Sequence, residues 1–329
     1  MTTPTFRYVF GPVPSRRLGR SLGVDLVPFK TCTYDCVYCQ LGRTTNKTLE
    51  RKEYVPLQDI VSELARKLAN EPAPDYVTLS GSGEPTLYSR LGDAIREIKR
   101  ITSVPVAVLT NGSLFWDREV RQSVGQADLV LPSLDAGDER LFQYVNRPHP
   151  LVRFDEMVAG LELLRREFSG RIWLEVLLLE GVTGSKAEVQ KIARLVERIE
   201  PDRVQLNTVV RPPAEEFAQA VPRERLEELA REFAGRGEVV AEFHDVERST
   251  SFLAAEGDVL SLLSRRPCSV EDIANGLRIR PNEAVKHVEQ LVSRGLVVSR
   301  VKNGRVFYTA TERHKRRESG RPDRGAATE

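Results

Sequence analysis

The chain has 329 residues, of which 40% are hydrophobic, and a formal net charge of +2. This length allows a sizeable core and about two domains, and the nearly balanced charge excludes a global field that would by itself attract nucleic acid. No apolar run reaches the ~18 residues of a membrane span, and the start MTTPTFRYVFGPV lacks the apolar segment of a signal peptide. Four cysteines are too few for a secreted disulfide scaffold. We therefore predict a soluble cytoplasmic protein without a membrane partner.

Short apolar runs alternate with amphipathic patterns over most of residues 1–245, the first predicted domain. The runs that we interpret as strands are LGVDLVP, YVTLS, VPVAVLT, DLVLPS, RIWLEVLLL, DRVQLNTVV and EVVAEF. The segments between them, such as LQDIVSELARKLAN and SKAEVQKIARLVERI, place apolar residues three and four apart, as one buried helix face requires. This alternation predicts an α/β fold, a parallel sheet covered by helices. About six such units favour a partial (β/α)6, TIM-like barrel, in which ligands bind at the loops after the strands.

The pattern changes after HDVERSTSF, and we predict a linker at 246–256 and a second domain at 257–310. Three short helical patterns come first, with Ser269 capping the second, Pro281 in the first turn of the third and Gly295 ending it. LVVSRVKNGRVFYTA then predicts two strands around an Asn-Gly turn. Three helices and a hairpin indicate a winged helix-turn-helix domain. The last segment, 311–329, has no apolar periodicity and is predicted to be a disordered basic tail.

Three of the four cysteines, Cys32, Cys36 and Cys39, lie together in KTCTYDCVYCQLG. A structural zinc ion takes four ligands, and no other Cys or His lies within a hundred residues of the three. A CxxC redox pair would leave Cys32 without a role, and three unrelated core cysteines at this spacing are less expected still. We favour an iron–sulfur cluster, because three thiolates bind three irons of a cubane and leave the fourth open, as in a catalytic metal site.

The spacing C-x3-C-x-aromatic-C, with Tyr38 as the aromatic residue, resembles the signature of the radical S-adenosylmethionine (SAM) superfamily. The resemblance implies a [4Fe-4S] cluster on Cys32, Cys36 and Cys39, with the open iron chelated by the amino and carboxylate groups of SAM. It also implies that the reduced cluster passes an electron to the sulfonium, and that the 5′-deoxyadenosyl radical so formed removes hydrogen from the substrate. An electron donor such as a flavodoxin or a ferredoxin is then an expected partner.

The segment LSGSGEP resembles the glycine-rich GGE element of the superfamily. Gly81 and Gly83 are expected to let the backbone approach SAM closely, and Glu84 to accept a hydrogen bond from the methionine ammonium group. Ser82 stands where GGE has a glycine, at a position that commonly varies.

Polar residues at the ends of three later strands match the superfamily in order. Asn111 in LTNG ends the third predicted strand. Ser133 and Asp135 in PSLDA end the fourth, where the superfamily has its ribose contacts. Asn207 in VQLNTV lies where the superfamily binds adenine. Each of these motifs is weak alone, since Gly and Asn at strand ends usually form turns. Because one such motif follows in each βα unit after the cysteine motif, the resemblance is specific over about residues 20–245.

FGPVPSRRLGRSLGVDL ahead of the cysteines, with SLDA and NRPHP after them, resembles more particularly the branch that contains the wyosine-tRNA synthetases and many bacterial relatives of unassigned substrate. Those synthetases build a tricyclic base on a methylated guanosine of tRNA, with a second cluster held by additional cysteines. This chain has no cysteine before Cys32 and only Cys268 after Cys39. A second three-cysteine site is impossible here, so wyosine synthesis is not expected.

Basic residues raise the question of substrate and partner. Arg16, Arg17 and Arg20 in PSRRLGRS form either a solvated loop or a grip for an anionic substrate such as a phosphate. His149 and its neighbours in NRPHP are candidates for the same mouth, although a lone His is more often structural. The predicted reading helix at 282–294 has a net charge of zero, whereas phosphate binding requires a positive excess.

The chain from Arg294 onward contains ten Lys/Arg and four Asp/Glu, which predicts a basic wing and tail. RNA, DNA and a peptide docked on the wing are the three candidate partners. Taken together, the sequence predicts a radical SAM enzyme that abstracts hydrogen from an unassigned substrate, with RNA or peptide modification as candidate reactions. The competing hypothesis is a DNA-binding regulator that uses the cluster as a sensor. A sensor has no need of the series of adenosyl-binding motifs, which is why we favour the enzyme.

Overall fold

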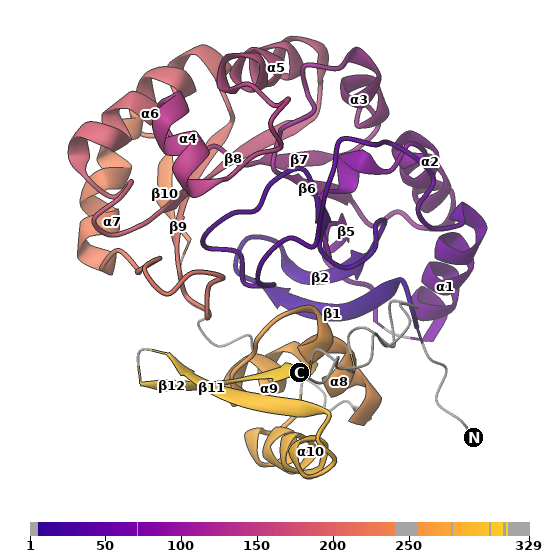
Figure 1. Cartoon of the computed structure of the whole chain (residues 1–329). Coiled ribbons are helices and arrows are strands. Elements are labelled where there is room, and N and C mark those ends of the chain that lie inside the picture. The colour runs from indigo at the N-terminus through magenta and orange to yellow at the C-terminus, as the bar shows by residue number, and fades with distance from the viewer. Residues whose placement is uncertain are drawn as a thin grey trace, which may run out of the picture.

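The computed structural model describes residues 6–70, 72–240, 256–277, 279–302, 304–311 and 314. The predicted linker at 246–256 and tail at 311–329 lie outside the described residues, apart from Glu256, Thr311 and His314. A large α/β part, residues 6–240, sits above a small part of three helices and a hairpin, residues 256–311 (Figure 1). Within the described residues, no helix is long and apolar enough to cross a membrane.

The large part is built on one eight-stranded sheet with the order β1-β2-β5-β6-β7-β8-β9-β10. Its strands are β1 (Val9–Ser15), β2 (Gly19–Val24), β5 (Tyr76–Leu79), β6 (Val106–Thr110), β7 (Leu129–Pro132), β8 (Arg171–Leu178), β9 (Arg203–Thr208) and β10 (Gly237–Val239). All neighbouring pairs are parallel except β1 and β2. The predicted α/β fold with a mostly parallel sheet is confirmed, and the seven runs interpreted as strands contribute the seven strands from β2 to β10 of this sheet, which does not close into a barrel.

The antiparallel strand β1 was not predicted. It carries Pro12 and Pro14, and proline cannot donate to a strand ladder, so its sequence VFGPVPS does not read as a strand. An edge position tolerates such a strand. Its presence moves the arginines of PSRRLGRS: Arg16 and Arg17 lie in the turn between β1 and β2, and Arg20 lies within β2 instead of before the first strand.

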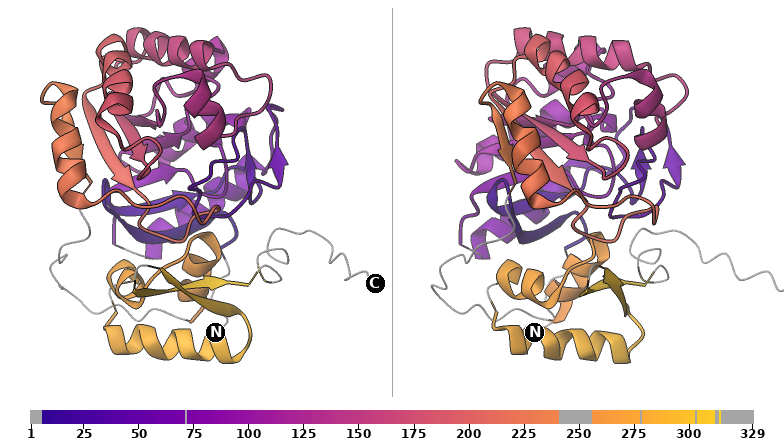
Figure 2. Two further views of the ribbon diagram at one scale, coloured as in Figure 1. Left: turned by 60° about the vertical axis from the view of Figure 1, so that its left-hand side comes forward. Right: turned by 90° about the vertical axis from the view of Figure 1, so that its left-hand side faces the viewer.

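Helices cover the outer face of the sheet, as the views in Figures 1 and 2 show. Each buries the apolar stripe that its sequence predicts; in α1, for example, Ile60 and Leu64 are fully buried. The helices of this part are α1 (Leu57–Asn70), α2 (Leu91–Ile101), α3 (Arg118–Ser123), α4 (Glu139–Val145), α5 (Phe154–Glu167), α6 (Lys186–Ile199) and α7 (Arg223–Ala230), with short 3-10 turns η1 (Pro85–Leu87) and η2 (Arg231–Phe233). A two-residue ribbon, β3 (Thr31–Cys32) with β4 (Asn46–Lys47), closes the base of the cysteine loop.

The small part has the helices and hairpin that the sequence predicts. Its elements are α8 (Glu256–Arg265), α9 (Val270–Leu277), α10 (Pro281–Ser293), β11 (Val297–Lys302) and β12 (Arg305–Ala310). The predicted cap of α9 is a reciprocal one: the Asp272 amide donates to the Ser269 hydroxyl at 3.2 Å, and the Ser269 amide donates to the Asp272 carboxylate at 3.1 Å. Lys302 pairs with Arg305 across the turn of the hairpin. The helix-turn-helix prediction is confirmed.

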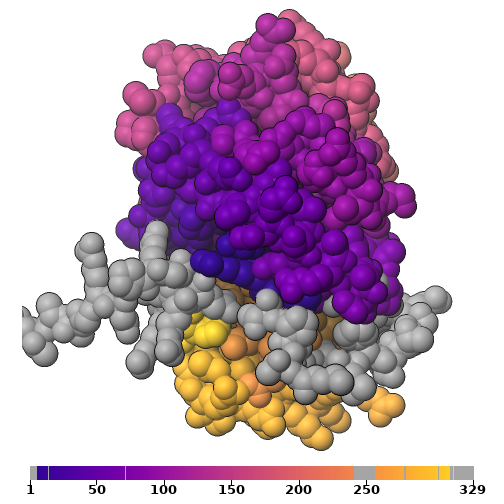
Figure 3. All heavy atoms as spheres, turned by 90° about the vertical axis from the view of Figure 1, so that its right-hand side faces the viewer, coloured from indigo at the N-terminus to yellow at the C-terminus, as the bar shows by residue number. Residues whose placement is uncertain are grey.

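Strand β1 belongs to the cores of both parts. Phe10 and Val13 pack into one cluster with Leu262, Leu263 and other apolar residues of the small part. In the space-filling view, the orange and yellow residues of the small part lie directly beneath the indigo N-terminal strands (Figure 3). The contact covers the open edge of the sheet, which would otherwise expose unpaired backbone groups.

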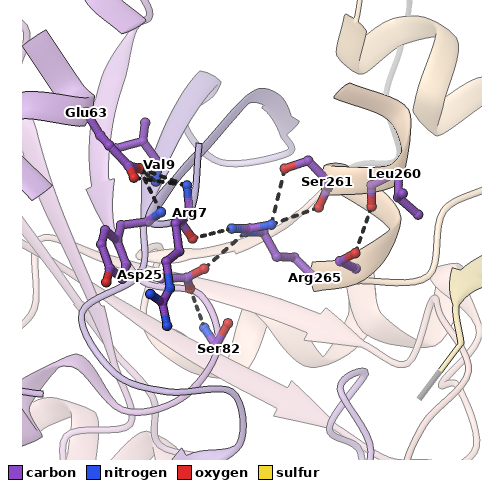
Figure 4. Close-up of polar contacts among 10 residues, drawn as sticks. Arg7, Val9, Asp25, Glu63, Ser82, Leu260, Ser261 and Arg265 are labelled. Carbon is purple, nitrogen blue, oxygen red and sulfur yellow. Dashed lines mark hydrogen bonds and ion pairs between the residues drawn. The ribbon is translucent and has the colours of Figure 1, made fainter. Parts of the chain in front are cut away.

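An ion pair ties α8 to the strand ends of the sheet (Figure 4). Arg265 Nε donates to Asp25 at 3.0 Å, its Nη2 donates to the Arg7 carbonyl at 3.0 Å, and its guanidinium lies over the Phe10 ring. The side chains of Asp25 and Arg265 are only 10% and 11% exposed. Burial raises the pKa of Asp25 even though the neighbouring Arg265 favours the ionised form. The small part is therefore docked through buried apolar and charged contacts.

We expect Arg265→Ala to lower the stability of the chain by about 3 kcal/mol, because removing one member of a buried ion pair leaves the other uncompensated. Urea unfolding followed by circular dichroism measures the change. Arg225→Ala is the matched control, since Arg225 pairs with Glu228 at an exposed site of α7 and such pairs contribute about 1 kcal/mol or less. Equal losses in the two variants would show that the interdomain pair has no special role.

Candidate active site

One cavity of about 360 Å³ lies at the carboxyl ends of the parallel strands and faces the small part. Eight of the eleven predicted site residues line it: Cys32, Cys36, Cys39, Gly81, Gly83, Glu84, Asn111 and Ser133. The parallel sheet brings together loops that are up to a hundred residues apart in the sequence, because the carboxyl ends of its strands meet at one edge. Leu262, Arg265 and Arg266 of the small part also line the cavity.

Each of the three clustered thiols has a side-chain nitrogen donor beside it. Lys30 Nζ lies 3.3 Å from Cys39 Sγ, Asn111 Nδ2 lies 3.6 Å from Cys32 Sγ, and Asn146 Nδ2 lies 3.6 Å from Cys36 Sγ. Such donors stabilise negative charge on sulfur. Lys30 was missed in the sequence analysis. Its one signal is its position next to the motif, since a lysine before CxxxCxxC otherwise looks like an exposed loop residue.

The three cysteines are half-buried, and at two of them, Cys32 and Cys36, the surroundings disfavour the thiolate form. Burial, with Glu84 nearby, raises the pKa of Cys32 to about 12, and burial also raises the pKa of Cys36 well above its usual value. A bound cation would displace these protons. Among the described residues, no three His, Cys, Asp or Glu side chains lie close enough together to hold a single metal ion. The donor set of three thiols fits an iron–sulfur cluster, because thiolates are the ligands that such clusters take.

The GSGE loop needs its glycines for close approach. A Cβ on Gly83 would lie 1.8 Å from the Thr31 carbonyl oxygen, and a Cβ on Gly81, whose φ is +116°, would lie 1.9 Å from Asp25 Oδ1. Because neither position carries a Cβ, the Glu84 amide can donate to the Thr31 carbonyl at 3.1 Å and the Ser82 amide to the Asp25 carboxylate at 2.8 Å. The loop is therefore pressed against the strand that carries Cys32.

Glu84 joins two of the predicted cofactor loops. Its Oε1 accepts from the Thr86 amide and from the hydroxyls of Thr86 and Thr110, and its Oε2 accepts from the Asn111 amide at 2.8 Å. Only 2% of the residue is exposed. A carboxylate offers about four lone-pair positions, and Oε2 receives only one of these donors. Oε2 is therefore the oxygen with capacity for the predicted ammonium contact.

The other three predicted residues, Tyr38, Asp135 and Asn207, do not line this cavity. Asp135 is buried between elements: the Tyr38 hydroxyl, the Asn146 amide group at 2.8 Å and the Leu177 amide at 3.0 Å donate to it. Burial raises the pKa of Asp135 to about 6, against the effect of these donors. Asn207 lines a neighbouring cavity and donates to Glu175 at 2.9 Å.

Glu175 is a second residue that the sequence analysis missed. It lies in β8, lines the cysteine-bearing cavity and pairs with Arg17 at 2.5 Å. Burial acts to raise the pKa of Glu175, but Arg17 holds it below the usual value. The signal was a single acidic residue inside the apolar run RIWLEVLLL.

The other basic residues that the sequence singles out lie in different surroundings. Arg17 lines the cavity, whereas Arg20 does not and donates to the Ala73 and Pro72 carbonyls ahead of β5. His149 Nδ1 accepts from the Leu151 amide at 3.3 Å, as expected for a structural histidine.

Two family models match the chain: one described as the Radical SAM superfamily over residues 26–196, and one described as a helix-turn-helix domain over residues 257–300. The protein named GTPase Obg of Brachyspira hyodysenteriae is 41% identical over 303 residues, 91% of this chain but only 45% of that protein, so the chain spans less than half of this relative. A UPF0026 protein of Methanocaldococcus jannaschii is 34% identical over 307 residues, 91% of this chain and 94% of the relative.

Among solved structures, a radical SAM methyltransferase from Sphaerobacter thermophilus matches with a TM-score of 0.50 at 22% identity. The match covers 67% of this chain and 66% of that one, and it concerns the fold alone.

The first family model spans more than half of the chain, which therefore belongs to the radical SAM superfamily and is an enzyme of that type. Membership implies SAM and an iron–sulfur cluster as cofactors. Within the superfamily the chain is a UPF0026 protein, because it matches such a relative over almost the whole of both lengths.

We expect Gly83→Ala to destabilise the GSGE loop by about 2 kcal/mol and to weaken SAM binding, because the added Cβ meets a backbone oxygen that cannot move aside. Thermal unfolding and calorimetric titration with SAM, both under anaerobic conditions, measure the two effects. The control is Gly257→Ala in α8, where an added Cβ meets nothing within 4 Å. Unchanged SAM binding in Gly83→Ala would contradict the assignment of this loop to the cofactor.

Proposed function

We propose that this chain binds a [4Fe-4S] cluster through Cys32, Cys36 and Cys39 and uses it to cleave SAM reductively, so that hydrogen is abstracted from a substrate. The observation that carries the proposal is the gathering of the three thiols and the GSGE, Asn111 and Ser133 positions around one cavity. A reduced cluster of this kind supplies the electron that breaks the bond from sulfur to C5′ of SAM. Residues of the chain itself bind and position these groups.

The chain's residues have distinct tasks in this proposal. Lys30, Asn111 and Asn146 direct N–H groups at the three sulfurs and so favour the thiolate forms. Glu84 Oε2 accepts from the ammonium of SAM while its other contacts fix the two loops on either side. The close approach at Gly81 and Gly83 leaves backbone groups accessible to the ligand.

In this proposal the small part limits the entry of water into the site. Its residues Leu262, Arg265 and Arg266 line the cavity. A carbon radical reacts with whatever C–H bond is nearest, so a closed cavity confines the reaction to the bound substrate.

We also propose an electron donor, a cellular compartment and a partner for the winged-helix domain. The electron comes from a small donor such as a flavodoxin or a ferredoxin, and the enzyme acts in the cytoplasm. RNA or a peptide is the proposed partner of the winged-helix domain. The likeness of FGPVPSRRLGRSLGVDL to the wyosine-tRNA synthetase branch supports a related ancestry, but the chain lacks the cysteines of a second cluster, so we do not propose wyosine synthesis.

The decisive experiment is anaerobic reconstitution with iron and sulfide, followed by addition of SAM and dithionite. We expect an absorption and electron paramagnetic resonance signature of [4Fe-4S] and formation of 5′-deoxyadenosine. Cys32→Ala, Cys36→Ala and Cys39→Ala should each lower this formation at least a hundredfold, because an incomplete ligand set does not hold the cluster.

Cys268→Ala is the matched control, because Cys268 is a buried thiol in the core of the small part and should not affect cleavage. Retention of 5′-deoxyadenosine formation by any of the other three variants, or binding of zinc with four ligands in place of iron, would overturn the proposal.

A second candidate function, a DNA-binding regulator that senses through its cluster, is favoured by the match to a helix-turn-helix domain. Such a protein has to place a positive surface on DNA. The helix α10 carries Glu283, Lys286 and Glu289, which gives it no positive excess.

We therefore expect weak DNA binding that falls steeply with salt and does not depend on the cluster. A gel-shift titration from low to physiological salt, with cluster-loaded and cluster-free protein, measures this. Cluster-dependent binding that persists at physiological salt, without SAM cleavage, would favour the regulator instead.

A further inference from the structure

Four arginines from distant parts of the sequence gather where the two parts of the chain meet. Arg16 and Arg17 come from the turn between β1 and β2, Arg211 follows β9, and Arg266 follows α8. The charges of Arg17, Arg211 and Arg266 all act on Arg16, and those of Arg17 and Arg266 act on Arg211. We refer to these four residues as the interdomain arginine cluster.

Two carboxylates face the interdomain arginine cluster. Glu175 pairs with Arg17 at 2.5 Å. Asp272 lies 3.6 Å from Arg211, beyond ordinary hydrogen-bond distance, and its other oxygen is occupied by the Ser269 amide. Glu271 lines the adjoining cavity, as does a further cation, Arg305. These two carboxylates pair with Arg17 and Arg211, and within the described residues neither of them pairs with Arg16.

Two of the guanidinium groups are incompletely satisfied by the described chain. Arg16 makes no hydrogen bond or ion pair with any residue that the structure describes. Arg211 is 9% exposed, and its Nε is buried without a hydrogen-bond partner among the described residues. Burial and the neighbouring Arg211 lower the pKa of Arg16 to about 10. Buried like charges of this kind are unfavourable unless an anion lies between them.

There is room for such an anion. Arg16 and Arg211 line a cavity of about 430 Å³ between the two parts, together with Ser269 and Asn275 of the small part. A second cavity of about 380 Å³ shares Arg16 and Phe307 with the first and extends to Asn207. Arg17 and Arg266 instead line the cysteine-bearing cavity. The interdomain arginine cluster therefore lies between the cofactor cavity and the space where the two parts meet.

We propose that the interdomain arginine cluster binds a phosphate monoester of the substrate, so that the winged-helix domain forms a wall of the substrate site. Binding of the anion stands on the cluster itself; its place in catalysis rests on the proposed function. A phosphate monoester carries close to two negative charges at neutral pH and three acceptor oxygens, which suits the forked donors of two incompletely satisfied guanidinium groups, Arg16 and Arg211. A carboxylate offers one charge and two oxygens. A phosphodiester within a nucleic-acid strand also carries one charge, so a terminal phosphate on a small molecule fits better.

The test uses the full chain and three probes at matched ionic strength: inorganic phosphate, acetate and bulk tRNA. We expect millimolar phosphate to raise the thermal midpoint and to give a saturable calorimetric titration, with acetate showing neither effect. Arg16→Gln and Arg211→Gln should each weaken phosphate binding about tenfold, as loss of one charge-assisted contact implies. Arg20→Gln, in the same sequence motif but bonded to Pro72 and Ala73 ahead of β5 and outside these cavities, should bind phosphate as the parent does.

Stability without phosphate separates a binding role from a structural one. Removing one of several crowded positive charges should leave the midpoint of Arg16→Gln equal to or above that of the parent, whereas a structural arginine would lower it. Equal phosphate binding by the parent and both cluster variants, equal effects of acetate and phosphate, or tighter binding of tRNA than of phosphate would each overturn the proposal.

The 5′-deoxyadenosine assay keeps this inference apart from the proposed function. Arginine-dependent phosphate binding without SAM cleavage supports the anion site and removes its catalytic role, while SAM cleavage without phosphate binding overturns the anion site alone.

Discussion

Hydrogen bonds between strands hold the sheet of this enzyme together, but they end near the carboxyl ends of the strands, where the loops around the site begin. Buried carboxylates continue the links there, each accepting from a neighbouring strand or from the loop after it. The four links are Asp25 to Ser82, Glu84 to Thr110 and Asn111, Asp135 to Leu177, and Glu175 to Asn207. Burying a carboxylate raises the free energy of the fold unless hydrogen-bond donors surround it. A backbone amide that donates to such a carboxylate is therefore held in place, because moving it would leave the carboxylate without a donor. The positions of the loops around the cavity depend on these links.

The same constraint joins the cofactor loop to the second domain. Asp25 accepts from the Ser82 amide on one side and from Arg265 on the other, while Gly81 lacks the Cβ that would collide with it. Docking of α8 therefore compensates the charge that holds the GSGE loop. Phe10 and Val13 add apolar contact along the edge strand, so the winged-helix domain is attached through the site region itself.

The site residues that could be predicted from the sequence lie at strand ends and are of the types that the cofactors require. The cysteines, the GSGE loop, Asn111 and Ser133 reach one cavity because parallel strands bring their carboxyl ends together. The direction of a side chain is harder to predict, since it depends on neighbours from other elements: Asp135 turns toward Tyr38 and Asn146, away from the cavity. Glu175 was hidden within an apolar strand sequence. Strand β1 was missed because its prolines suit only an edge, and an edge is recognised only once its neighbours are in place.

The arrangement of the winged-helix domain bears on both proposed functions. Its α8 and α9 pack on β1, while α10 lies on the opposite side, away from the sheet (Figures 1 and 2). In a helix-turn-helix domain the later helix is the one that enters a DNA groove, and here it is accessible but not positively charged. The charge that such a domain would need for phosphate lies instead on the inner side, where Arg266 joins three arginines of the sheet domain. A domain that turns an arginine toward the sheet domain is suited to completing a site within its own chain, and its outer face stays accessible to a partner at the same time.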